Sequence, residues 1–195
     1  MVRRALLLLV LALALGGLFC GVAQAASTAT FLDEQFLAAH HTAITGEMLV
    51  DAWHWYGIDV LPMLVILGAE SSLGDPELGG GSVPAHNYGN LKSSDTPSRW
   101  QELANGRWYC PGQGWYFTYP SAEIGIMAEG RYLKMGPSFD PGWYKRLFDQ
   151  TPIDWAAFAR LYYGADVPGL AAYTANLYTL ESRFRTRSLA AGFVW

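Results

Sequence analysis

The chain has 195 residues, of which 51% are hydrophobic, 14% aromatic and 15% charged, and its formal net charge is −4. It has 13 basic and 17 acidic residues and no basic tract, which makes it a poor candidate for binding nucleic acid or an anionic membrane surface.

Residues 1–25 have the pattern of a secretory signal peptide. A basic start at Arg3-Arg4 precedes the apolar run 5–15, and Ala23-Gln24-Ala25 supplies a cleavage site of small residues. A membrane anchor is the alternative, but the apolar run is too short to span a bilayer comfortably. We therefore expect a secreted chain that does not stay inserted in the membrane after cleavage.

The remaining residues 26–195 are enough for a single domain with its own core, and we expect a monomer. Removing the two arginines of the leader leaves 11 basic and 17 acidic residues, a net charge of −6. The mature part keeps one cysteine, Cys110, so no internal disulfide can form. We interpret Cys110 as a buried apolar filler rather than a nucleophile, because neither a helix N-terminus nor a nearby histidine is there to activate it.

The sequence predicts neither a metal nor a cofactor. Its four histidines lack the His-Glu-x-x-His spacing, and no paired cysteines accompany them. The "GGGS" stretch neither follows a strand nor ends in Gly-Lys-Ser/Thr, so it does not indicate a phosphate loop.

The first half of the mature chain is predicted to be helical. Residues 31–56 carry apolar side chains at helical spacing and are divided at "TAITG". The next helix is predicted from Val60 to about Ser72, with Asp59 as its N-cap and Gly74 and Pro76 ending it. This helix is apolar nearly all round, which is typical of a buried central helix.

Residues 74–120 change character and are rich in Gly, Pro, Asn, Ser and aromatics. "RWYC" and "GWYFTY" read as short strands, and Asn105-Gly106 is a strong hairpin turn signal. Helices resume after Ser121, a predicted N-cap, and continue in "PIDWAAFARLYYG", with Asp154 in its first turn, and in "PGLAAYTANLYTLESRFRTRS". The predicted fold is mainly α (α+β), with a small β-hairpin or loop lobe forming one side of a cleft.

Glu70 lies at the end of the apolar helix. It is the sole ionisable side chain between Asp59 and Asp75. A carboxyl with apolar neighbours should have a raised pKa, as a general acid near neutral pH requires. The competing interpretation is a solvated helix end, which the helix dipole disfavours slightly for a glutamate.

The stretch "YGIDVLPMLVILGAESSLG", followed by "HNYGNLK", resembles the peptidoglycan glucosaminidase domains of the lysozyme-like superfamily. The resemblance rests on a buried helix ending in Glu-Ser-x-x-Gly and on an Asn-aromatic-Gly turn, and it covers about residues 31–187. Two departures stand out. Asn90-Leu91 makes the turn one residue longer, and the late "AYTANLYTLESRF" segment has Asn176 where the family has Asp.

The resemblance implies roles for several residues. Glu70 would be the catalytic acid that protonates the glycosidic oxygen. Tyr173 would be a cleft tyrosine that positions substrate or stabilises charge, with Tyr163 and its neighbour Tyr162 as alternatives. Asn87 and Tyr88 would form the turn that faces the cleft, with Asn87 bonding locally or to sugar.

A second carboxylate is not defined by the sequence. Glu102 ranks ahead of Asp95, and a solvated loop is the simpler interpretation for both. The 2-acetamido group or the 6-hydroxyl of the sugar could replace such a carboxylate. The aromatic residues of the insert, of which Trp100 and Trp115 are the main candidates, could stack on sugar or form a small core.

Together with the predicted signal peptide, the resemblance implies a secreted, cell-wall-associated glycoside hydrolase whose partner is the peptidoglycan glycan strand. The expected reaction is that of an endo-β-N-acetylglucosaminidase acting on β-1,4 bonds. A lytic transglycosylase or muramidase on the same fold is the first alternative. A non-catalytic wall-binding or interaction protein that keeps the scaffold is the second.

Overall fold

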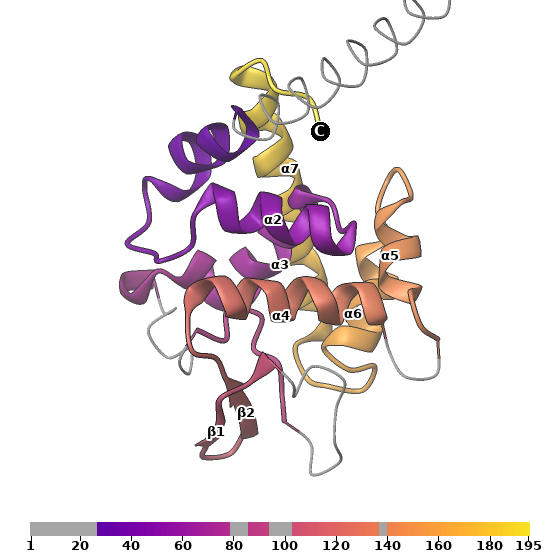
Figure 1. Ribbon diagram of the computed structural model, residues 1–195. Helices are drawn as coiled ribbons and strands as arrows, with labels where there is room; N and C mark the ends of the chain where they lie inside the picture. The colour runs from indigo at the N-terminus through magenta and orange to yellow at the C-terminus, as the bar shows by residue number, and fades with distance from the viewer. Residues whose placement is uncertain (1–26, 79–85, 94–102, 137–139) are drawn as a thin grey trace, which may run out of the picture.

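The computed structural model describes residues 27–78, 86–93, 103–136 and 140–195. The described part is mainly helical with one small hairpin, as the sequence predicts (Figure 1). The α-helices are α2 (Gly46–Tyr56), α3 (Val60–Ser71), α4 (Ala122–Met135), α5 (Trp143–Phe148), α6 (Trp155–Tyr162) and α7 (Leu170–Ala190), and the strands are β1 (Gly106–Cys110) and β2 (Gly114–Thr118). A π-helical turn, Asp33–Leu37, and two 3-10 turns, Ser72–Gly74 and Pro76–Leu78, complete these elements. The predicted signal peptide, residues 1–25, lies outside the described residues.

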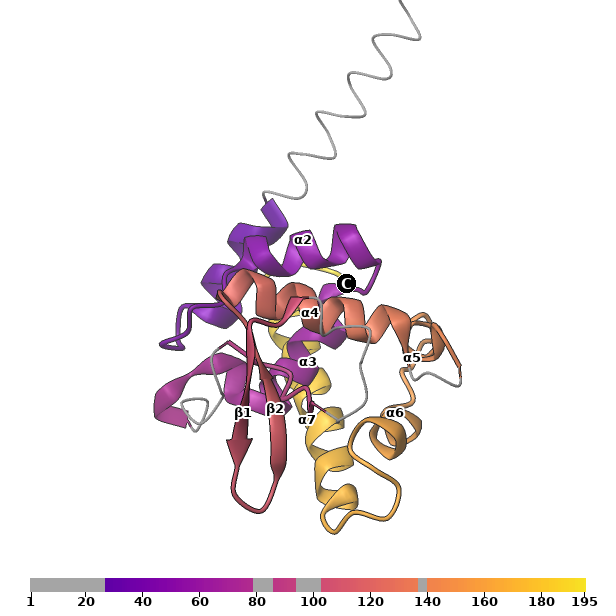
Figure 2. The same ribbon diagram turned by 60° about the horizontal axis from the view of Figure 1, so that its bottom comes forward.

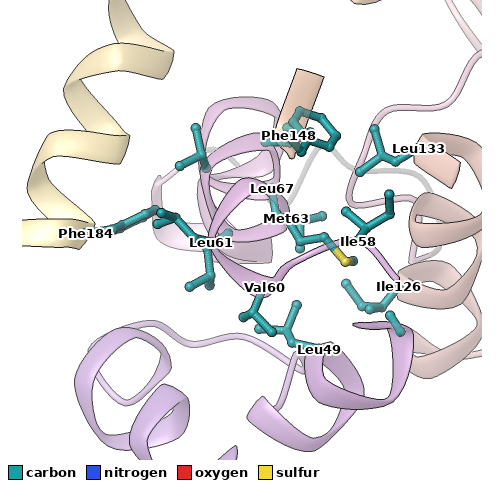
Figure 3. Packing of buried hydrophobic residues seen from close by; sticks show 14 of the residues in the cluster. Leu49, Ile58, Val60, Leu61, Met63, Leu67, Ile126, Leu133, Phe148 and Phe184 are labelled. Atoms are coloured by element: carbon teal, nitrogen blue, oxygen red, sulfur yellow. The ribbon is translucent and has the colours of Figure 1, made fainter. Parts of the chain in front are cut away.

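Helix α3 is the centre of the core. Eight consecutive side chains from Val60 to Leu67 are buried, because α2, α4 and α7 surround the helix. Figure 3 shows Leu49 of α2, Ile126 of α4 and Phe184 of α7 meeting the α3 side chains from three sides. The apolar composition on every face of this helix is therefore explained by contact on every face.

Helix α3 ends earlier than the glycine and proline after it suggest. Ser72 adopts the left-handed conformation, with φ of 50°, and closes the helix directly after Ser71. The Ser71 hydroxyl accepts a hydrogen bond from the Gly74 amide and fixes the chain reversal. Asp59 occupies the N-cap position, but its side chain makes no capping hydrogen bond.

The later helices begin at the expected caps. The Ser121 side chain accepts from the Ile124 amide at the start of α4. Asp154 precedes α6 and accepts from the Ala157 amide, so it is the N-cap of this helix rather than part of its first turn. Helix α5 was not predicted, because its six residues are too short to show a periodic pattern.

The hairpin turn is not at Asn105-Gly106, which corrects the sequence prediction. Gly106 already pairs with Thr118 as the first residue of β1, and the chain reverses between Cys110 and Gly114. Gly112 and Gly114 have φ of 81° and 100°, a conformation that glycine supplies at low cost. Asn105 instead accepts a hydrogen bond from the Thr118 hydroxyl at the open end of the hairpin.

The hairpin packs on a small apolar cluster of its own, formed by Leu91, Phe117, Tyr119 and Ala128. Figure 2 shows the hairpin extending from the helical body, with α6 and the beginning of α7 on the other side. Within the described residues, no helix has the length and apolar character needed to cross a membrane.

Candidate active site

A cavity of about 610 Å³ opens at the end of α3, between the hairpin and the region of α6. Glu70 lies on its wall, and the hairpin tip and the 90–92 segment also line it. The lining residues are Glu70, Asn90, Leu91, Lys92, Gly112, Gln113, Tyr116, Tyr132, Tyr162, Tyr163 and Val167. Glu70 is the one carboxyl among these described residues, and four of its companions are tyrosines.

Both carboxylate oxygens of Glu70 are held from outside its own helix. The Tyr173 hydroxyl of α7 donates to Oε1 at 2.5 Å. The Asn90 side-chain amide donates to Oε2 at 3.2 Å and to the Glu70 carbonyl at 2.6 Å. These contacts join α3, α7 and the 90–92 segment at one carboxyl.

The pKa of Glu70 is raised above its ordinary value. Burial is the largest cause, and it outweighs the hydrogen bonds from Tyr173 and Asn90 and the charge of Lys92, all of which lower the pKa. Tyr173 stays protonated because burial, followed by the nearby Glu70 carboxyl, raises the pKa of its hydroxyl. The site therefore combines a carboxyl whose pKa is raised with a tyrosine donor whose pKa is raised as well.

The turn that carries Asn90 to Glu70 is held by Asn87. Its side-chain amide donates to the Leu91 and Phe117 carbonyls, and its Oδ1 accepts from the Leu91 amide. Asn87 is 1% exposed and does not line the cavity. Its bonding is thus local, one of the two options that the sequence left open.

Tyr88 also points into the protein rather than into the cavity. It is 6% exposed and packs in the main core, and its hydroxyl contacts His86 Nδ1 at 3.2 Å. The residue of this turn that reaches Glu70 is Asn90, which the sequence did not single out for this role. Asn90 adopts a left-handed conformation with φ of 52°, which asparagine tolerates better than most residues.

The turn approaches α4 closely because each of the two elements has a glycine where the other comes nearest: Gly125 faces the turn backbone, and Gly89 faces the Glu129 side chain. A Cβ on Gly125 of α4 would lie 1.9 Å from the His86 carbonyl oxygen. A Cβ on Gly89 would lie 1.9 Å from Oε2 of Glu129, also on α4. Neither position has room for a side chain, so the turn sits directly on the helix.

The predicted tyrosines gather near Glu70 in different ways. Tyr163 stacks on Tyr173, with ring centroids 4.6 Å apart and an interplanar angle of 13°. Tyr162 lines the cavity and donates to the Gly89 carbonyl at 2.6 Å. Of the three, Tyr173 is the one whose hydroxyl contacts the Glu70 carboxyl.

The hairpin presents its aromatic residues on two faces. Tyr116 is directed to the cavity and is 6% exposed. Trp115 is 44% exposed, packs against Tyr109 and Arg107, and is not part of the cavity lining. Trp100, Glu102 and Asp95 lie outside the described residues.

Sequence reasoning missed a second carboxyl, Glu129, on the buried face of α4. It is fully buried, and Tyr162 contacts its Oε1 at 3.1 Å. Burial is the main reason why its pKa lies well above the ordinary value, and the Glu70 charge raises it further. The signal was present in the helical pattern, since Ile126, Glu129 and Leu133 fall on one stripe.

The described residues hold no group of three or more His, Cys, Asp or Glu side chains placed to bind a metal ion. Cys110 is a free thiol that is partly exposed at the end of β1, which corrects the prediction that it is buried, because the two-stranded hairpin leaves this end open to solvent.

The chain was compared with known proteins. No family model matches it, and no curated protein matches it by sequence. Among solved structures, it is similar to the catalytic domain of the autolysin Auto from Listeria monocytogenes. The sequence identity is 23% and the TM-score 0.44, over 70% of this chain and 78% of that one.

Proposed function

We propose that this chain is a peptidoglycan hydrolase that cleaves β-1,4 glycosidic bonds of the cell-wall glycan, with Glu70 as the general acid. The observation that carries the proposal is the position of Glu70. A carboxyl with a raised pKa lies on the wall of a cavity at the end of a buried helix, and a tyrosine from another helix holds it. This arrangement supports catalysis because a general acid needs its proton near working pH and a fixed orientation.

The contacts of Glu70 support a fixed orientation for the proton transfer. Tyr173 donates to Oε1 and Asn90 donates to Oε2, so the carboxyl is held in one position on the wall of the cavity, from which it would donate its proton to a glycosidic oxygen. When the proton leaves, the carboxylate that forms is stabilised by Tyr173, by Asn90 and by the charge of Lys92. The groups that lower the pKa of Glu70 therefore also stabilise the carboxylate that remains after the proton has been transferred.

The residues that line the cavity also favour one kind of nucleophile for the attack on the anomeric carbon. Among the described lining residues, Glu70 is the one carboxyl, which favours a reaction in which the sugar itself or water attacks the anomeric carbon. Attack by a 2-acetamido group fits a glucosaminidase, and attack by a 6-hydroxyl fits a lytic transglycosylase. Glu102 remains a proposed partner that would act in place of either.

The experiment that tests the reaction is product analysis on purified peptidoglycan. We expect muropeptides with reducing N-acetylglucosamine ends, identified by mass spectrometry before and after borohydride reduction. Products with 1,6-anhydro ends would replace the glucosaminidase with a transglycosylase. Reducing N-acetylmuramic acid ends would indicate a muramidase. A complete lack of glycan cleavage by the folded chain would refute the hydrolase.

Replacing Tyr173 with Phe should lower kcat about tenfold and move the basic limb of the pH–rate profile upward. The hydroxyl orients Glu70, and its hydrogen bond lowers the pKa of Glu70. Its loss is equivalent to about 1.4 kcal/mol in the transition state, which is tenfold in rate. Glu70 acts while protonated, so a higher pKa extends activity to higher pH.

Tyr178→Phe is the matched control, because Tyr178 lies on the same helix and is 44% exposed. It should keep the wild-type rate and pH profile. If the basic limb of the pH–rate profile is unchanged in the Tyr173 variant, Tyr173 does not influence the pKa of Glu70 and has no role in the proposed reaction.

A further inference from the structure

The Tyr162 hydroxyl lies between two oxygens. It is 2.6 Å from the Gly89 carbonyl oxygen and 3.1 Å from Glu129 Oε1. A phenol has a single proton to donate, and a carbonyl oxygen can only accept. The shorter contact therefore takes the tyrosine proton, and the lone pairs of Tyr162 face Glu129. The contact with Glu129 is then a hydrogen bond only if the carboxyl itself supplies a proton.

The surroundings of Glu129 favour the neutral carboxyl. Among the residues that the structure describes, its Oε2 has no hydrogen-bond partner, and it lies against Gly89 with no exposed surface on the side chain. An ionised carboxylate in such a site would cost several kcal/mol without a partner. Six described acids or phenols interact electrostatically with Glu129, and they come from α3, the segment after β2, α4, α5, α6 and α7: Glu70, Tyr119, Tyr132, Tyr144, Tyr162 and Tyr173.

We propose that Glu129 is a positioning residue that stays protonated in the folded protein, donates its proton to Tyr162, and through Tyr162 and Gly89 holds the turn that carries Asn90 to Glu70. The connection is continuous. Tyr162 fixes the Gly89 carbonyl, and the next residue, Asn90, donates to the Glu70 carbonyl and carboxylate. Glu129 does not line the cavity, so it acts on the reaction through Tyr162 and the turn. This role in catalysis rests on the proposed function, whereas the protonation state does not.

The protonation state can be tested without any activity assay, by urea unfolding of the wild type and Glu129→Gln over a series of pH values. A carboxyl that is neutral when folded and ionised when unfolded makes unfolding easier as the pH rises above its ordinary pKa. The unfolding constant of the wild type should therefore rise about tenfold per pH unit relative to that of Glu129→Gln, from the ordinary glutamate pKa up to the folded-state pKa. Stability from this group is thus full in acid and is lost as the pH increases.

Two outcomes of this series would overturn the proposal. A ratio of unfolding constants that stays constant with pH would mean that Glu129 titrates equally in both states. A ratio that falls as the pH rises would mean an ionised carboxylate in the folded protein. If Glu129→Gln does not fold, the carboxyl carbon of Glu129 in ¹³C-glutamate-labelled wild type reports the same state by NMR, and an ionised shift at neutral pH overturns the proposal.

The positioning role is tested by activity on purified peptidoglycan. Glu129→Gln keeps a neutral donor for Tyr162, whereas Glu129→Met keeps the length but has no donor. We expect kcat to fall by about tenfold in the Met variant and to be rescued to within about threefold of wild type in the Gln variant, with the basic limb of the pH profile unmoved. Equal loss in both folded variants would mean that the ionised carboxylate is needed and would refute the role. A wild type without lytic activity would refute the proposed function, while the unfolding series would still decide the protonation state.

Discussion

Replacing Glu70 with Gln should reduce the rate of glycan cleavage by about a thousandfold, within the range that general acid catalysis contributes. The amide cannot supply a proton to the glycosidic oxygen. It is nevertheless nearly the same shape, and its oxygen still accepts from Tyr173 in place of Oε1. The measurement is the initial rate of release of soluble muropeptides, with thermal unfolding followed on the same samples.

The Glu70 variant should unfold at the wild-type temperature or slightly above, because it removes a carboxyl whose ionisation burial disfavours. Glu77→Gln is the matched control, since the Glu77 side chain is 71% exposed on the loop after α3, and it should retain the wild-type rate. Lytic activity of Glu70→Gln within tenfold of wild type, with the control unchanged, would show that Glu70 is not the acid.

Replacing Gly125 with Ala should destabilise the protein by about 3 kcal/mol, because the new methyl group would meet the backbone of the turn. Its Cβ would lie 1.9 Å from the His86 carbonyl oxygen, and neither the helix nor the turn can yield locally. The turn would have to move away from α4, and Asn90 would leave Glu70 with it. Urea unfolding measures the loss of stability, and the lytic assay should show a parallel loss of kcat.

Gly68→Ala is the matched control for this substitution. Gly68 is also a helical glycine, but its Cβ would find ordinary contacts at 3.5 Å or more with Leu180 and Phe184. Alanine is the better helix former by up to about 1 kcal/mol, so this variant should be as stable as the wild type or more stable. If Gly125→Ala behaves in the same way, the close packing of the turn on α4 is not a constraint on the fold.

The sequence predicted the central helix well, with Glu70 near its end, because the apolar character of α3 is strong over most of its length. Nine of its twelve residues are buried, so the pattern and the environment agree. The caps at Ser121 and Asp154 were equally readable, since a short polar side chain before an apolar helix has a local physical role.

The parts that could not be predicted depend on contacts between distant segments. Asn105-Gly106 has the composition of a hairpin turn, but the pairing of Trp108 with Tyr116 and the burial of Phe117 place the reversal at the next glycines. The choice between two local turn signals was made by packing, which a local pattern does not contain.

In the candidate site, too, some residues follow from the local sequence pattern and others do not. Glu70 could be singled out from the sequence because it ends an apolar run. Glu129 was missed because a glutamate in a helix that also carries Glu123 and Lys134 reads as part of a solvated face. Asn90 reaches Glu70 across 20 residues of chain, a contact that only the folded turn creates.

The cavity has one wall that belongs to the large hydrophobic cluster and another that belongs to the small one, and we expect the two walls to differ in mobility. Glu70 extends from a helix buried in the large cluster, whose backbone amides should exchange only on global unfolding. The part of the cavity wall that Leu91 and the hairpin form belongs to the small cluster. Local unfolding of a small cluster costs less free energy than local unfolding of a large one. In the proposed reaction, local opening of the hairpin side would therefore admit a glycan strand, while the proton donor Glu70 keeps its position.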